Sequence, residues 1–232
     1  MRTEPGALLA VGREADVFDA GNGRVLRRYR HRAVMDQEVV AMRWARGHGY
    51  PAPEVVDVDG ADMLMERVGE ATMLTDLGRR PWLILAHADR LASLHQQLHS
   101  IPAPPDLTLQ APTGGDDFLH LDLHPENVMV GSDGPWVIDW AGARRGHAAD
   151  DVAYSWIIMA TSDIPGDALT RAIAAVGRRS FMSRFLSHFS RDEVLAQLAA
   201  VGEQRLEDRN VTETEGARVR RLVQRALAGH AR

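Results

Sequence analysis

The chain has 232 residues, of which 45% are hydrophobic and 25% charged, and it carries a net charge of -5 with no cysteine. This ordinary globular composition suits one larger domain, or two small ones around a cleft, and it argues against a broad basic face for nucleic acid. The lack of cysteine excludes disulfides and thiolate chemistry, and no apolar run approaches the roughly 18 residues of a membrane span, so we expect a cytoplasmic protein.

The first 66 residues predict a small antiparallel sheet with one helix. Short apolar runs indicate strands at 7–11, 16–20, 24–29, 54–58 and 63–67. Asn22-Gly23 is a strong hairpin signal, because both residues tolerate positive φ. Met35, Val39 and Met42 recur at helical spacing, which predicts a helix over 33–46.

The rest of the chain predicts a mainly helical lobe with a small β insertion. Helices are expected at 72–79 and 82–99, and a proline-rich loop at 101–117. Short strands are expected at 118–121, 128–130 and 136–140. From residue 150 the pattern is helical to the end, with breaks near 162–166 and 190. The fold class is therefore α+β.

The stretch HLDLHPENVMV, from His120 to Val130, gathers most of the chemistry-bearing side chains. One interpretation is an ordinary polar loop between two strands. Another is a histidine metal site, because His120, Asp122 and His124 would share one face of a strand. Pro125 argues against a continuing strand, since proline cannot donate to a ladder.

A third interpretation fits more of these residues. Asp122 and Asn127 form the pattern H-x-D-x-x-x-x-N, and Asp139 follows Asn127 after a turn at Asp133-Gly134. A hairpin would bring the Asn127 amide beside the Asp139 carboxylate. Mg²⁺ prefers such oxygen ligands and shares them with substrate phosphates. Asp122 would lie ahead of the metal, free to accept a proton from an attacking hydroxyl.

With the following WVIDW, the stretch resembles the catalytic and metal-binding core of the aminoglycoside phosphotransferase family, which includes choline kinase-like small-molecule kinases. The resemblance runs from about Gly12 to Ala153. It implies a bilobal protein-kinase-like fold, with a nucleotide-binding β lobe at 1–66, a hinge at 67–70 and a helical lobe at 71–232.

The resemblance also implies a reaction and the residues that perform it. The chain would move the γ-phosphate of ATP, or of GTP, to a hydroxyl of a small-molecule acceptor. Asp122 would be the catalytic base, and His124 would contact the transferring phosphate. Asn127 and Asp139 would hold Mg²⁺, while His120 would support the loop.

The N-terminal lobe departs from the family pattern at two places. The turn that would cover the phosphates, with Gly12, Arg13 and Val17, has one glycine. Arg27 stands where the family carries a lysine that binds the α- and β-phosphates, and Glu38 is placed to pair with it. An arginine keeps the charge but has a larger, bidentate fork, so the geometry must differ.

Four further residues are expected around the purine. Glu66 and Val68 flank the hinge, where the backbone would bind the base edge. Met129 and Ile138 would form the floor of the base pocket, or serve as ordinary core residues.

The segment after Asp139 distinguishes the kind of kinase. Residues 140–150 contain no Ser, Thr or Tyr, which argues against a phosphorylated activation segment and a protein substrate. We expect Asp151 to brace a loop or cap a helix. The acceptor should lie between the catalytic loop and the helices after residue 150, with wall candidates that include Trp156, Met159, Glu203 and Glu207. The alternative, prompted by Arg27 and the glycine-poor turn, is a nucleotide-binding pseudokinase or regulatory module without transferase activity.

Overall fold

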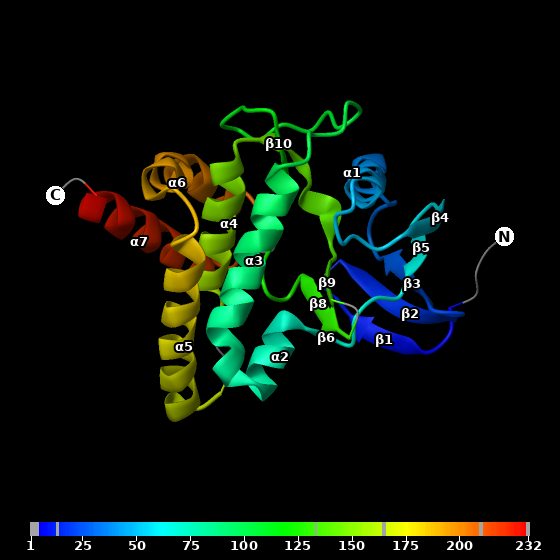
Figure 1. The fold of residues 1–232 in the computed structure, drawn as a ribbon, viewed down its shortest axis with the longest axis horizontal. Helices are drawn as coiled ribbons and strands as arrows, with labels where there is room; N and C mark the ends of the chain where they lie inside the picture. The colour runs from blue at the N-terminus through cyan, green and yellow to red at the C-terminus, as the bar shows by residue number, and fades with distance from the viewer. Residues whose placement is uncertain (1–4, 13, 133, 164–165, 209–210, 231–232) are drawn as a thin grey trace.

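The computed structural model describes residues 5–12, 14–132, 134–163, 166–208 and 211–230. It is a mixed α+β fold, with a five-stranded antiparallel sheet on one side and most of the helices on the other (Figure 1). The strand order is β1-β2-β3-β5-β4, with the bounds β1 Leu8–Val11, β2 Ala15–Gly21, β3 Arg24–Tyr29, β4 Val55–Asp59 and β5 Asp62–Glu66. Helix α1, Asp36–Gly47, connects β3 to β4.

The β2–β3 hairpin confirms the prediction made from Asn22-Gly23. Gly21, Asn22 and Gly23 have φ values of 71°, 52° and 69°. A residue with a β-branched side chain would be strained in such a left-handed conformation. The turn therefore places the Arg27 strand beside the strand of Val17 in a defined register.

The helical part contains six α-helices among the described residues. Their bounds are α2 Met73–Arg79, α3 Ile84–His99, α4 Ala148–Thr161, α5 Ala168–Leu186, α6 Arg191–Leu206 and α7 Glu213–His230. Two short 3₁₀ turns are η1, Pro81–Leu83, and η2, Trp140–Gly142. Helix α4 lies among α3, α5, α6 and α7 (Figure 1). None of the helices described has an apolar stretch long enough to cross a bilayer.

Two small sheets connect these parts. Strands β6 (Ala71–Thr72), β8 (Val128–Gly131) and β9 (Gly134–Val137) form one, and β7 (Asp117–Leu119) pairs with β10 (Arg144–Gly146) in the other. Figure 1 shows β8 and β9 between the large sheet and the helices. Sequence patterns did not predict β6 or β10, because strands of two or three residues show no alternation.

Several predicted boundaries differ from the structure, and three of them have a clear local reason. The first helix begins at Asp36 rather than Ala33, because Val34 N–H donates to Gly60 O at 2.9 Å and holds the preceding residues against the β4–β5 turn. The strands expected to reach Leu121 and Trp140 end earlier. Leu121 and Asp139 have φ values of 55° and 65°, which interrupt extended backbone.

Trp140 packs against residues from both the N-terminal part, which holds the large sheet, and the helical part of the molecule. It is fully buried, and its ring lies 5.6 Å from Tyr50, 5.8 Å from Phe118 and 4.7 Å from His120, measured between centroids. Its indole Nε1 donates to Val137 O at 3.0 Å. Because these contacts fix Trp140, the backbone of the preceding Asp139 is fixed as well.

His95 on α3 is buried and uncharged. Its Nδ1 lies 2.9 Å from Leu91 O and its Nε2 3.0 Å from the Ser155 hydroxyl, a pattern that assigns the proton to Nδ1. Burial lowers its pKa from 6.5 to about 4. His95 is thus a packing residue that links α3 to α4.

We expect the free energy of unfolding to fall as the pH is lowered from 6.5 to 4. The unfolded chain takes up a proton on His95 before the folded chain does, so the loss is complete below about pH 4 and reaches roughly 3 kcal/mol. Urea titrations at pH 7, 5.5 and 4.5 measure it. His95→Gln should flatten this dependence, whereas the exposed His31→Gln should leave it unchanged. Equal pH slopes for the wild type and His95→Gln would contradict it.

Candidate active site

A hairpin brings the second half of the candidate site together. Strands β8 and β9 pair antiparallel, with Val128 opposite Val137. Beyond them Ile138 N–H donates to Asn127 O at 3.0 Å. Asn127 and Asp139 therefore leave the hairpin at the same end. The predicted hairpin is present, although Asp133 in its turn lies outside the described residues.

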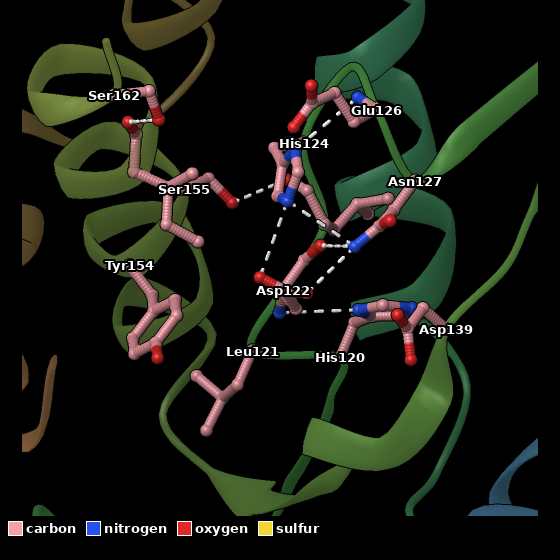
Figure 2. Close-up of polar contacts among 12 residues, drawn as sticks. His120, Leu121, Asp122, His124, Glu126, Asn127, Asp139, Tyr154, Ser155 and Ser162 are labelled. Carbon is pink, nitrogen blue, oxygen red and sulfur yellow. Dashed lines mark hydrogen bonds and ion pairs between the residues drawn. The ribbon is translucent and has the colours of Figure 1, made fainter. Parts of the chain in front are cut away.

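Asp122 lies at the centre of the polar cluster in Figure 2. Asn127 Nδ2 donates to Asp122 O and to its Oδ2, both at 2.8 Å. His124 Nε2 lies 3.4 Å from Asp122 Oδ1. The Asp122 side chain keeps 34% of its surface exposed, so a substrate can approach it. Because Asn127 uses its amide nitrogen here, its Oδ1 remains available to a cation.

Asp151, at the start of α4, holds the loop that carries Asp122. Its fully buried carboxylate accepts from Leu121 N–H at 2.7 Å and from His120 N–H at 3.2 Å, and it contacts His99 Nε2 at 3.0 Å. Burial acts to raise the pKa of Asp151, but the hydrogen bond from His99 acts against it, and the pKa is lowered overall. The carboxylate is therefore ionised and stabilises the left-handed Leu121 backbone.

His120 links this loop to the β8–β9 hairpin. Its Nε2 donates to Ile138 O at 3.2 Å, so its Nδ1 is the acceptor for Asp122 N–H at 3.3 Å. Burial lowers the pKa of His120, which keeps the ring neutral and preserves this pattern. Asp122 and Asp139 are thus positioned by one side chain, as expected for a supporting residue.

Arg27 joins the large sheet to the hairpin. One Nη donates to Asp139 Oδ1 at 2.6 Å and the other to Glu38 Oε1 at 3.2 Å. The dense surroundings of Asp139 act to raise its pKa, but the charge and hydrogen bond of Arg27 lower it, so the carboxylate is ionised. The expected pairing of Arg27 with Glu38 is present. The contact with Asp139 was not foreseen.

Tyr29 is a further member of this cluster that sequence reasoning missed. Its hydroxyl lies 2.6 Å from Glu38 Oε1 and 2.8 Å from Oε2, and Arg32 approaches the same carboxylate at 3.8 Å. Tyr29 follows Arg27 by two residues on β3, so the alternation of a strand already places both on one face. By contrast Arg28 points to the other face and pairs with Asp62 at 2.7 Å.

The turn between β1 and β2 is tight. Gly12 N–H donates to Ala15 O at 2.9 Å, and a Cβ on Gly12 would lie 2.8 Å from that oxygen. Arg13 lies outside the described residues. Val17 lies opposite Arg27 in the β2–β3 register. In the part of the chain that the structure describes, no hydrogen bond joins this turn to the Asp122 cluster.

The residues expected around the purine lie where β5 leaves the large sheet. The Glu66 carboxylate accepts from Arg46 at 2.8 Å and from Glu54 N–H at 3.1 Å, so its side chain is used in packing. Val68 is almost buried, and its N–H has no acceptor among the described residues. Gly69, with φ 61°, packs so closely that a Cβ would lie 2.7 Å from Met129 Cβ. Ile138 is half-buried beside Asn127.

A histidine metal centre finds no support in the described ranges. They contain no group of three or more His, Asp or Glu side chains able to hold a metal ion. The oxygen pair of Asn127 and Asp139 fits a hard cation that is shared with substrate phosphates better than it fits zinc.

The geometry above agrees with a family match. Residues 115–194 match the phosphotransferase enzyme family. This segment contains the stretch from His120 to Val130, both candidate metal ligands and Asp151, so the resemblance seen in the sequence is confirmed there. No curated protein matches the chain significantly.

Solved structures of small-molecule kinases are similar in fold to this chain along nearly its whole length. A choline/ethanolamine kinase family protein from Mesorhizobium loti has a TM-score of 0.61 at 18% identity, covering 97% of this chain and 92% of its own. A thermostable mutant of aminoglycoside phosphotransferase APH(4)-Ia, in complex with ADP and hygromycin B, has a TM-score of 0.61 at 17% identity, with coverages of 97% and 94%. Plasmodium vivax ethanolamine kinase has a TM-score of 0.58 at 10% identity, with coverages of 94% and 81%. These TM-scores over nearly the whole chain show that the fold is that of the protein-kinase-like small-molecule kinases.

Proposed function

We propose that the protein is a Mg²⁺-dependent phosphotransferase that moves the γ-phosphate of ATP to a hydroxyl of a small molecule. The observation that carries the proposal is the arrangement of Asp122, Asn127 and Asp139, three oxygen-bearing side chains held by one loop and one hairpin. The family match over 115–194 and the kinase folds support it.

In this proposal Asp122 orients the acceptor hydroxyl and accepts its proton as the new O–P bond forms. His124, 3.4 Å from Asp122, contacts the transferring phosphate. Asn127 Oδ1 and Asp139 hold Mg²⁺, which when bound neutralises the β- and γ-phosphate oxygens. The Asp139 side chain keeps 38% of its surface exposed, so a cation can approach it.

The nucleotide lies between the large sheet and the β8–β9 hairpin in this proposal. Arg27 binds the α- and β-phosphates while Glu38 holds its guanidinium, and the Gly12–Val17 turn covers the phosphates. The free N–H of Val68 binds the purine edge, with Met129 and Ile138 beneath the base. Residues 1–66 form the nucleotide lobe, 67–70 the hinge and 71–232 the acceptor lobe of a cytoplasmic enzyme.

The proposal is tested by ADP release with ATP or GTP across a panel of hydroxyl compounds, with Mg²⁺ titrated. We expect turnover that requires Mg²⁺ and an acceptor. Asp139→Asn should weaken the Mg²⁺-dependent part of ATP binding, measured by calorimetry with and without the ion, because a neutral amide is the poorer cation ligand. Mg²⁺-independent binding and no turnover with any acceptor would contradict the proposal.

One observation favours the second candidate, a nucleotide-binding module without transferase activity. Arg27 occupies one oxygen of Asp139 at 2.6 Å, so the arginine competes with a cation for the same carboxylate. This candidate predicts a thermal shift with ATP without ADP release, and turnover that appears in Arg27→Lys, whose single ammonium is smaller than the guanidinium fork.

A further inference from the structure

A cavity lies between the C-terminal end of α4 and one face of α7. Its volume is about 290 Å³, close to the lower limit of small-molecule pockets. Its lining consists of Ala160, Thr161, Arg218, Arg221, Leu222 and Arg225. Asp151, which holds the Asp122 loop, lies at the other end of α4, so roughly 15 Å of helix separates the cavity from that loop.

The end of α4 explains the position of two arginines near this cavity. Arg218 donates to Thr161 O at 2.9 Å, and Arg178 of α5 donates to Ala160 O at 3.4 Å. The last carbonyls of a helix have no partner within it and carry partial negative charge, so they attract cations. Arg218 also lies 2.5 Å from the carboxylate of Asp163. These two arginines therefore cap α4.

Arg221 and Arg225 have no such explanation. Both are exposed, and neither makes a hydrogen bond or an ion pair with any residue that the structure describes. They follow Arg218 at i+3 and i+7, so the three side chains line the same cavity from one face of α7. Like charges at these spacings destabilise a helix. The lining contains no carboxylate to offset them.

Elsewhere in the helical part, arginines at helix contacts meet a carboxylate from the neighbouring helix. Arg205 of α6 lies 2.8 Å from Glu215 of α7, and Arg184 of α5 lies 2.6 Å from Asp89 of α3. Helix α7 thus supplies an acid where it faces α6 and three arginines where it faces the end of α4. The cavity is the place where the counter-charge must come from outside the described chain.

The packing of α7 fixes the position of the cavity. Val219, next to Arg218, is fully buried. Val223 lies so close to α6 that a Cβ on Gly202 would be 2.9 Å from its side chain. The half-buried Leu222 gives the cavity an apolar wall between the arginines. Because the helix is held on its other faces, the three guanidinium groups are gathered before a ligand arrives, which lowers the cost of binding.

We propose that this cavity binds a small free molecule with two or more negative charges on phosphate groups, with Arg221 and Arg225 as its main ligands and Arg218 at its edge. Guanidinium forks match phosphate oxygens bidentately, and several of them call for more than one negative charge. The site is separate from the Asp122 cluster and does not rest on the proposed phosphotransferase function.

The test is calorimetric titration of inorganic pyrophosphate, orthophosphate and citrate into the full chain at constant ionic strength. We expect pyrophosphate to bind most tightly. Arg221→Gln and Arg225→Gln should each raise its Kd by about 10-fold, the effect of losing one charge-assisted contact. Arg220→Gln is the matched control, because Arg220 is exposed on α7 but does not line the cavity. Pyrophosphate bound at the proposed nucleotide site would respond to none of these changes.

Thermal unfolding without ligand gives a second measurement. Arg225→Gln should unfold at the wild-type temperature or above it, because the variant loses the repulsion from Arg221. A lower temperature would show that Arg225 is neutralised within the protein and would overturn the proposal. So would equal pyrophosphate Kd values in the wild type and both variants, including no binding to any of them. Tighter binding of citrate, or binding to phosphatidylglycerol vesicles without binding of pyrophosphate, would overturn the assignment to a free phosphate compound.

Discussion

Replacing Asp122 by Asn is expected to lower kcat for phosphoryl transfer by about 10³-fold, the effect of removing a positioned proton acceptor. The amide keeps the size of the side chain and can still meet Asn127, which lies 2.8 Å from Asp122 Oδ2. ATP binding should therefore change little, since Asp122 is not among the groups that hold the nucleotide. Steady-state ADP release and calorimetric ATP titration measure the two effects separately.

The matched control is Asp116→Asn. Asp116 directly precedes β7, the strand that leads into the Asp122 loop. Its side chain is 91% exposed, and it pairs with Arg145 at 3.6 Å. It should keep the turnover of the wild type. Equal kcat for Asp122→Asn and the wild type would remove the assignment of Asp122 as the proton acceptor, because no other described carboxylate lies in its place.

Replacing Asp151 by Ala is expected to lower the free energy of unfolding by about 3–5 kcal/mol, the cost of breaking a buried, hydrogen-bonded ionic contact. The fully buried carboxylate accepts a hydrogen bond from His99 Nε2 and satisfies the N–H groups of His120 and Leu121. Its loss leaves these donors unpaired in the interior, where each costs further free energy. Urea unfolding at pH 7 measures the change.

The control for stability is Asp106→Ala, at an exposed position of the 101–117 loop, where the carboxylate makes no hydrogen bond or ion pair with the described residues. It should lie within about 0.5 kcal/mol of the wild type. Residual folded Asp151→Ala should also lose turnover, because the left-handed Leu121 backbone no longer has its anchor. A loss below about 1 kcal/mol would show that other contacts hold the loop.

Much of the fold followed from local patterns. The strand at Arg24–Tyr29 was predicted with its observed bounds, since alternation and the Asn22-Gly23 turn act over a few residues. The strands that the sequence did not predict are those whose formation depends on residues distant in the chain. Strand β6 exists because Ala71 pairs with Val130, and β10 because Arg144 pairs with Leu119. Neither partner can be read from the strand itself.

In the candidate site, too, some features follow from local sequence and others depend on tertiary packing. The motif from His120 to Asn127, followed by Asp139, could be recognised in the sequence. One loop and the hairpin after it hold these side chains, so their spacing along the chain was enough to predict that they lie close together. The pairing of Arg27 with Glu38 also followed from a strand and the next helix. That Arg27 bonds Asp139, 112 positions away, depends on how the large sheet packs on the hairpin.

The sequence by itself therefore determined the class of fold and the residues of the proposed phosphoryl-transfer centre, because both depend on periodicity and short spacing. Only the tertiary structure decided which groups surround that centre. Arg144 was one arginine in a pair until β10 placed it opposite Leu119, half-buried and without a carboxylate partner among the described residues. Charge neutralisation in the interior depends on neighbours from distant segments, and those neighbours are set by packing.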